Sequence, residues 1–162
     1  MKKCVFAGTF DPPTTGHKNI IEQCLKIFDG VVVAVMINSD KVPLLSEEQR
    51  QALLKKMYKD DSRVKVIVFG GAAVDLLEKE NTPFYVRGVR NTLDFEYENI
   101  NFFASKKLKK DMVTIYIPSE QENLHVSSKL VRNSLKFGKD FKDCIPEEIY
   151  GDFVEMLEKN NV

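Results

Sequence analysis

Short apolar runs alternate with longer stretches of helical periodicity along the chain. The runs predict five strands, at residues 4–6, 31–37, 64–69, 83–86 and 113–117. The periodic stretches predict a first helix through Ile20, Cys24, Ile27 and Phe28, and further helices at residues 46–58, 72–79, 93–109, 127–137 and 146–159. Strands that alternate with helices predict an α/β fold with a doubly wound, five-stranded parallel sheet in a single domain, residues 1–162.

Polar and turn-forming residues mark the ends of several elements. The sequence S-E-E-Q at residues 46–49 has the pattern of a capping box, which opens the second helix. Pro146 fits the first position of the last helix. The fourth strand is expected to end where R-G-V-R begins at Arg87, and Pro118 is expected to stop the fifth strand.

The turn after the first strand carries the residues most typical of a binding site. Two glycines and two prolines between residues 8 and 16 predict a sharp path with outward-facing backbone N–H groups. Such a turn before a helix suits a phosphate group, and His17 lies in the first helical turn. From the residues alone, a plain turn with a capping histidine is an equal alternative. The spacing is neither that of a Walker loop nor that of a G-x-G-x-x-G fingerprint.

Polar side chains follow several of the predicted strands at their carboxyl ends. They are Thr9 and His17, Lys41, Arg87 and Arg90, and Ser127 and Ser128. Ligands of open α/β sheets bind beyond the carboxyl ends of the strands, where the strand order switches. We therefore expect these side chains to gather at one edge of the sheet.

Two of these pairs allow both a binding and a structural interpretation. Arg87 and Arg90 can grip phosphate or carboxylate oxygens in a bidentate way, or form salt bridges with Asp94 or Glu96. Ser127 and Ser128 can bind an anion at a helix N-terminus, or serve as a serine N-cap. The residues alone leave both alternatives open.

Composition excludes several other classes of protein. Apolar residues are 43% and charged residues 30% of the 162, and 24 basic residues balance 24 acidic ones, which argues against nucleic-acid and membrane-surface partners. Three scattered cysteines without a C-x-x-C pair fit a reducing compartment and give no zinc site. No run resembles a signal peptide or reaches the roughly 20 apolar residues of a membrane span. We therefore expect a cytoplasmic protein.

Three motifs together resemble those of bacterial phosphopantetheine adenylyltransferases. They are G-T-F-D-P with T-T-G-H at 8–17, R-G-V-R with D-F-E-Y-E at 87–98, and H-V-S-S-K-L-V-R at 125–132. T-T-G-H matches the (H/T)-x-G-H hallmark of the wider nucleotidyltransferase superfamily. The chain departs from the family pattern at Ala7 (often proline), Val126 (usually isoleucine) and Lys129 (usually serine or threonine).

The resemblance implies a Rossmann-like nucleotidyltransferase fold and a specific reaction. ATP and 4′-phosphopantetheine would give dephospho-coenzyme A and pyrophosphate by direct in-line attack, without a covalent intermediate. It also implies magnesium, a homohexamer, and dephospho-coenzyme A and coenzyme A as ligands, while no residue of the chain is assigned as a metal ligand.

The resemblance to the family implies roles for residues inside these motifs and for a few residues outside them. The catalytic residues would be His17, Lys41 and Arg90, and the phosphopantetheine ligands would be Thr9, Lys41, Ala73 and Arg87. The ATP ligands would be Thr9, Phe10, His17, Gly88, Val89, Arg90, Glu98, Asn123, Leu124, His125, Val126, Ser127, Ser128 and Lys129. Asp11 is expected to hold the turn, and for His125 the residues alone favour a place on a surface loop.

Two other functions remain as alternatives to this one. The first is another adenylyl- or cytidylyltransferase, acting on nicotinamide mononucleotide or a phospho-alcohol. The second is a non-catalytic nucleotide-binding or sensor domain on a flavodoxin-like sheet, which would bind ATP and release no pyrophosphate with any acceptor.

Overall fold

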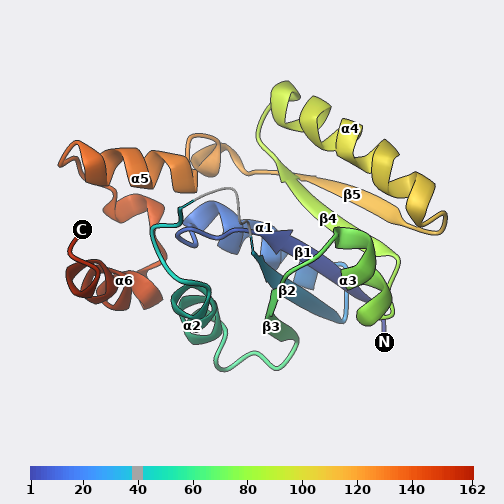
Figure 1. Cartoon of the computed structure of the whole chain (residues 1–162), viewed down its shortest axis with the longest axis horizontal. Helices are drawn as coiled ribbons and strands as arrows, with labels where there is room; N and C mark the ends of the chain where they lie inside the picture. The colour runs from blue at the N-terminus through green and yellow to red at the C-terminus, as the bar shows by residue number, and fades with distance from the viewer. Residues whose placement is uncertain (38–41) are drawn as a thin grey trace.

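The computed structural model describes residues 1–37 and 42–162, and its five strands form one parallel sheet (Figure 1). The strand order is β3-β2-β1-β4-β5. The strands are β1 Lys3–Gly8, β2 Gly30–Met36, β3 Val64–Phe69, β4 Phe84–Val89 and β5 Val113–Pro118. The prediction of a doubly wound, five-stranded parallel sheet is confirmed.

Helices cover both faces of this sheet. They are α1 Thr15–Leu25, α2 Glu47–Met57, α3 Ala73–Lys79, α4 Thr92–Leu108, α5 Ser128–Lys136 and α6 Glu147–Lys159, with short 3₁₀ turns η1 Gln121–Asn123 and η2 Lys142–Cys144. One core joins alternate β1 and β2 residues, such as Phe6 and Val33, to α1, α2, α5 and α6. A second core joins the intervening residues, such as Val5 and Val32, to α3. Each central strand therefore has two apolar faces, as expected of a covered parallel sheet.

Several element boundaries differ from the sequence-based expectation. β4 continues through Val89 rather than stopping before Arg87, because β5 pairs with it as far as Val89 and Pro118. α1 ends at Leu25, so Ile27 lies beyond the helix and is 55% exposed, whereas Phe28 lies in the core. Pro146 is the N-cap of α6 and not its first helical residue. The capping box that opens α2 is confirmed.

The topology creates a switch point at β1. The chain runs from β1 outward to β2 and β3, and then returns to place β4 on the other side of β1. Such a reversal opens a crevice beyond the carboxyl ends of the two diverging strands. Gly88 lets α1 approach β4 there, because a Cβ atom at this position would lie 2.9 Å from Cγ1 of Ile20.

Candidate active site

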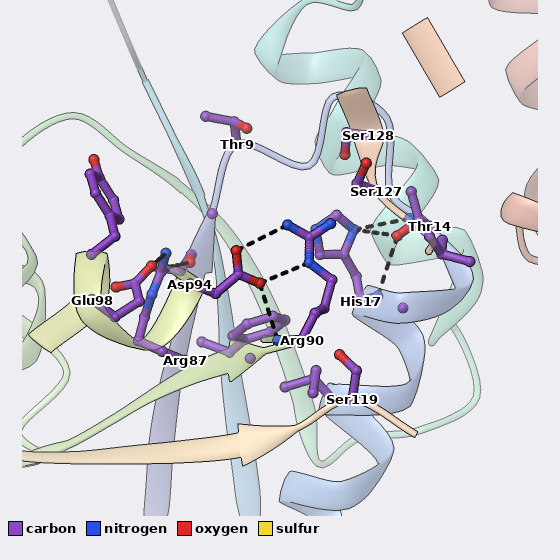
Figure 2. Close-up of a pocket in the computed structure, with 18 of the residues that line it drawn as sticks. Thr9, Thr14, His17, Arg87, Arg90, Asp94, Glu98, Ser119, Ser127 and Ser128 are labelled. Carbon is purple, nitrogen blue, oxygen red and sulfur yellow. Dashed lines mark hydrogen bonds and ion pairs between the residues drawn. The ribbon is translucent and has the colours of Figure 1, made fainter. Parts of the chain in front are cut away.

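A cavity of about 390 Å³ lies at this switch point (Figure 2). Its walls come from the ends of β1 and β4, the first turns of α1 and α4, and the start of α5. Nine of the residues assigned from the motifs line it: Thr9, His17, Arg87, Gly88, Arg90, Glu98, Val126, Ser127 and Ser128. The expected gathering of these segments at one edge of the sheet is therefore confirmed for the residues that the structure describes.

The hydrogen bonds of His17 fix the position of its proton. Thr14 is the N-cap of α1, and its backbone N–H donates to Nδ1 of His17 at 3.0 Å. Nδ1 therefore acts as an acceptor, and the proton of the neutral ring lies on Nε2. Burial, together with the positive charges of Arg87 and Arg90, lowers the pKa of His17 to about 4. At neutral pH the cavity wall thus presents a neutral N–H donor.

Aromatic rings pack against the imidazole of His17 and hold it in place. The Phe10 ring is almost fully buried and meets the imidazole edge to face, with 4.8 Å between ring centroids. Phe6 packs against Phe10 in the same manner at 5.5 Å. Phe10 is not among the described residues that line the cavity, so its side chain holds His17 in place instead of lining the site.

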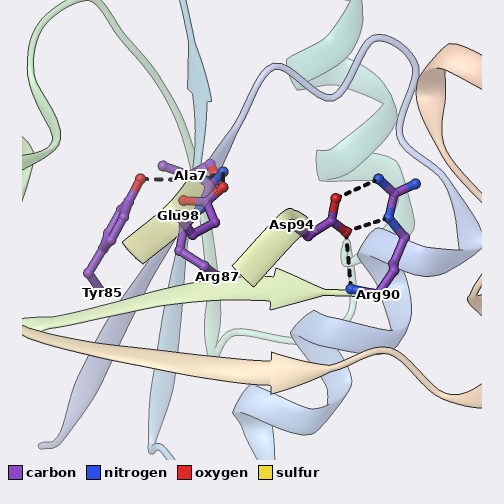
Figure 3. Close-up of polar contacts among 6 residues, drawn as sticks. All are labelled: Ala7, Tyr85, Arg87, Arg90, Asp94 and Glu98. Atoms are coloured by element: carbon purple, nitrogen blue, oxygen red, sulfur yellow. Dashed lines mark hydrogen bonds and ion pairs between the residues drawn. The ribbon is translucent and has the colours of Figure 1, made fainter. Parts of the chain in front are cut away.

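The two arginines each pair with a carboxylate of α4 (Figure 3). Arg90 donates from Nε and Nη2 to the two oxygens of Asp94, at 2.9 and 3.2 Å. Arg87 pairs with Glu98 rather than with Asp94 or Glu96, and it also donates to the Ala7 carbonyl. The salt-bridge interpretation is therefore confirmed for Arg90 with Asp94, and Arg87 forms its salt bridge with Glu98 instead. Both arginines also line the cavity, where binding of an anion stays a prediction.

The start of α5 likewise combines a structural role with a place in the cavity wall. Ser127 is the N-cap, and its Oγ accepts a hydrogen bond from the Leu130 N–H at 3.1 Å. Ser128 donates from Oγ to the Pro12 carbonyl at 2.7 Å. Both hydroxyl oxygens lie where the positive end of the α5 dipole favours an anion.

Comparisons with known proteins all point to nucleotidyltransferases. The cytidylyltransferase-like family model matches residues 5–134. A phosphopantetheine adenylyltransferase from Clostridium beijerinckii is 36% identical over 97% of this chain and 99% of its own length. One from Campylobacter fetus is 39% identical over 93% and 97%, respectively. This chain belongs to the phosphopantetheine adenylyltransferase family. The structure also resembles a putative nicotinate-nucleotide adenylyltransferase from Vibrio parahaemolyticus, with a TM-score of 0.65 and 27% identity over 91% of this chain and 96% of that one.

Membership in the phosphopantetheine adenylyltransferase family confirms the resemblance drawn from the three motifs.

The assigned residues that do not line the first cavity lie in several different places. Ala73 lines a second cavity of about 300 Å³, which shares Arg87, Tyr97 and Glu98 with the first. Lys41 lies outside the described residues. Besides Phe10, five assigned residues are among the described residues that line neither cavity: Val89, Asn123, Leu124, His125 and Lys129. The last three are exposed, in agreement with a surface place for His125.

The structure also adds cavity residues to those assigned from the motifs. Leu93, Asp94 and Tyr97 of α4 line the first cavity together with Glu98. Their spacings of three and four residues put them on one helix face, a signal that the sequence already contained. Ser119 directly follows β5 and also lines this cavity, as the strand-end rule would have indicated.

Asp11 holds the turn as expected. Its carboxylate accepts hydrogen bonds from the N–H groups of Leu44 and Leu45, at 2.8 and 2.9 Å.

Within the described residues, no helix has the length and apolar character that crossing a membrane requires. Nowhere in residues 1–37 and 42–162 do three or more His, Cys, Asp or Glu side chains gather as metal ligands.

Proposed function

We propose that this chain transfers the adenylyl group of ATP to 4′-phosphopantetheine, giving dephospho-coenzyme A and pyrophosphate. The observation that carries this proposal is the chemistry of the first cavity. It combines a neutral imidazole N–H, two guanidinium groups and two serine hydroxyls, and its two α4 carboxylates are each paired with an arginine. Such a site supplies charged and neutral hydrogen-bond donors, and it suits a reaction whose nucleophile is already an ionised phosphate.

The reaction then depends on alignment and charge stabilisation. An oxygen of the acceptor phosphate attacks the α-phosphorus of ATP in line, a new P–O bond forms, and the bond to the bridging oxygen breaks as pyrophosphate leaves. Alignment of two reactants can supply roughly 7–11 kcal/mol of the barrier reduction. Nε2–H of His17 would donate to the charge that develops on the phosphate oxygens, a contribution of about 3–4 kcal/mol for one preorganised donor.

ATP would occupy the first cavity with its phosphates near the start of α5. Arg90 and the hydroxyls of Ser127 and Ser128 lie in the walls there, and a helix N-terminus attracts phosphate. Asp94 holds the Arg90 guanidinium in one orientation, which reduces the entropy lost when a phosphate binds.

The acceptor would extend from the first cavity into the second. Thr9 would hold its phosphate, together with Lys41 by family resemblance, and Arg87 lies between the two cavities because it lines both. The pantetheine arm carries amide groups that need hydrogen-bond partners. Asn101 and Ser105 carry polar side chains in the wall of the second cavity and would supply such partners.

Magnesium would enter this site with ATP. Mg²⁺ is usually bound by one or two carboxylates together with substrate phosphates rather than by a cage of protein ligands. Asp94 and Glu98 are the carboxylates that line the first cavity among the described residues, and each is already paired with an arginine, so the triphosphate oxygens would hold most of the ion's coordination. When bound, the ion would neutralise charge on the triphosphate.

The α4 helix supports the proposal of a homohexamer. None of its residues, all of which the structure describes, is buried, although the helix carries many large apolar side chains. Leu93, Ile100 and Leu108 are each more than 70% exposed. An apolar surface of this kind is typical of an interface between protein chains. Sedimentation at several protein concentrations tests this assembly, and a monomer at all concentrations would contradict it.

The product and its derivative complete the set of proposed ligands. Dephospho-coenzyme A would span both cavities, and coenzyme A, which shares most of its structure, would compete for the same site. A cytoplasmic location also belongs to this proposal, because ATP is the co-substrate and the three cysteines of the chain are free thiols.

Pyrophosphate release tests the reaction directly. The protein is mixed with Mg-ATP, or in parallel with Mg-CTP, and one of three acceptors: 4′-phosphopantetheine, nicotinamide mononucleotide or a phospho-alcohol. We expect pyrophosphate and dephospho-coenzyme A with 4′-phosphopantetheine only. Pyrophosphate with another acceptor alone would establish a different nucleotidyltransferase, and ATP binding without pyrophosphate from any acceptor would establish a non-catalytic domain.

A further inference from the structure

Two arginines from distant helices hold the turn between β1 and α1 by its backbone. Arg50 of α2 donates from Nη1 to the Thr9 carbonyl at 2.8 Å. Arg132 of α5 donates from Nη1 to the Asp11 carbonyl at 2.6 Å. Among the described residues, neither arginine lines the first or the second cavity. Thr9 does line the first cavity, so any displacement of this turn changes the cavity wall.

The residue between these two carbonyls has an unfavourable backbone conformation. Phe10 has a φ of 50°, in the left-handed region that bulky residues rarely adopt. Such a conformation persists only where the surrounding structure holds it. Because the Phe10 ring also packs against the imidazole of His17, a relaxation of this backbone would move His17 as well.

The Arg50 guanidinium is buried and forms several contacts. Its residue is 2% exposed, Nε donates to the Ser46 carbonyl at 3.2 Å, and Nη2 pairs with Glu47 at 3.2 Å. A buried guanidinium is stable only when its donors are satisfied. The contacts to Ser46 and Glu47 stay at the start of α2, whereas the hydrogen bond to Thr9 reaches the site.

Arg132 binds the same turn from α5, together with the first residue of that helix. Ser128, four residues before it, donates to the Pro12 carbonyl, so α5 holds two consecutive carbonyls of the turn. The helix end that we assign to the ATP phosphates is therefore fixed to the turn that carries Thr9.

We propose that Arg50 and Arg132 are positioning residues, which hold the turn through the Thr9 and Asp11 carbonyls and thereby set the relative places of the Thr9 hydroxyl and the His17 imidazole. Their effect on the rate rests on the proposed adenylyl transfer. Their effect on the position of His17 does not, and it can be measured without any substrate.

Lysine substitutions test the positioning role. Arg50→Lys and Arg132→Lys each keep the charge but replace a planar group with several donors by one flexible ammonium. We expect each variant to lower kcat about 10- to 100-fold, because small displacements at a reacting centre have effects of this size.

Each lysine variant has a matched control. Glu47→Gln removes the charged partner of Arg50 and leaves its hydrogen bond to Thr9. Lys136→Ala removes an exposed charge from the same helix as Arg132. We expect both controls to keep the kcat of the wild type. If Glu47→Gln were as impaired as Arg50→Lys, the role of Arg50 would be to stabilise α2, and the proposal would fail.

The imidazole signals of His17 provide a readout that loss of stability alone does not move. The chain has two histidines, so the variant His125→Gln leaves His17 as the single source of imidazole ¹⁵N signals. In this background we expect the Nδ1 shift of His17 to change in Arg50→Lys and Arg132→Lys and to stay constant in both controls. Unchanged His17 shifts in the folded lysine variants would overturn the proposal. If one lysine variant does not fold, the other decides. Absence of adenylyl transfer in the wild type would instead refute the proposed function and leave this test intact.

Discussion

Nδ1 of His17 accepts a hydrogen bond from the backbone N–H of Thr14, its own helix N-cap, at 3.0 Å. The histidine is therefore both a capping residue and a residue of the cavity wall. The capping role uses Nδ1, which leaves Nε2–H for a substrate. The two interpretations that the sequence left open are thus compatible, because the two ring nitrogens serve different partners.

Replacement of His17 by alanine should lower kcat far more than it weakens ATP binding. Loss of one preorganised donor to transition-state charge typically lowers kcat about 10²- to 10³-fold. Steady-state kinetics with varied ATP separate kcat from KM. Lys136→Ala is the control and should be unaffected, because Lys136 is exposed on α5 and lines neither described cavity. A raised KM at unchanged kcat would reject a transition-state role for His17.

The low pKa of His17 makes the stability of the protein depend on pH. In the unfolded chain His17 binds a proton below about pH 6.5, whereas in the folded chain it does so only below about 4. The unfolded state thus binds more protons between these values, and the free energy of unfolding falls as the pH falls from 6.5 to 4. Compared with pH values below 4, the free energy of unfolding above pH 6.5 is higher by on the order of 3 kcal/mol.

Urea unfolding of the wild type and of His17→Gln across pH 4 to 8 measures this contribution. The difference in unfolding free energy between the two proteins should decrease toward pH 4, because glutamine does not titrate. All other ionisable groups are common to the two proteins, so their effects cancel in the difference. A difference that stays constant with pH would show that His17 is not held neutral by the fold.

Replacement of Gly88 by alanine should destabilise the protein by about 1–3 kcal/mol, the usual effect of overpacking. The new Cβ would lie 2.9 Å from Cγ1 of the buried Ile20, and α1 would have to move away from β4. Activity should fall as well, since α1 carries His17. The measurement is thermal or urea unfolding combined with pyrophosphate release.

Gly151 provides the matched control for Gly88. A Cβ built at this position in α6 would point into open space away from its own helix, and alanine is favoured over glycine inside a helix by about 0.5–1 kcal/mol. Gly151→Ala should therefore be neutral or stabilising. Equal unfolding midpoints for the two variants would show that β4 and α1 do not need the close approach seen at Gly88.

Replacement of Asp94 by asparagine should weaken the hold on Arg90. Burial tends to raise the pKa of Asp94, but its hydrogen bonds with Arg90 outweigh this effect and keep the pKa below its usual value. Loss of a charged hydrogen bond corresponds to about 1.5–3 kcal/mol, so kcat/KM for ATP should fall roughly 10-fold or more. Asp75→Asn, on the exposed side of α3, is the control. An unchanged kcat/KM would show that Arg90 binds ATP without help from Asp94.

The local sequence pattern predicted most of the elements of the fold and many of the residues that line the cavity. The apolar runs located all five strands, and the periodicity located the helices to within a few residues. Errors arose where a distant partner extends an element. β4 continues over Arg87 and Gly88 because β5 pairs alongside, and no local signal in R-G-V-R reports that pairing. The role of Phe10 was also missed, because its contact with His17 depends on a left-handed backbone and not on spacing.

The sequence by itself determined the type of each element, the parallel sheet and the family motifs, because side-chain periodicity records which faces of a segment are apolar. The strand-end rule also predicted that His17, Arg87 and Arg90 lie at one edge of the sheet. Only the tertiary structure decided that β1 lies beside β4 and that Arg50 reaches the turn at Thr9. It also decided the charge state of His17, since burial and neighbouring guanidinium groups set its pKa. These properties arise between residues far apart in the chain, and no spacing within one segment can encode them.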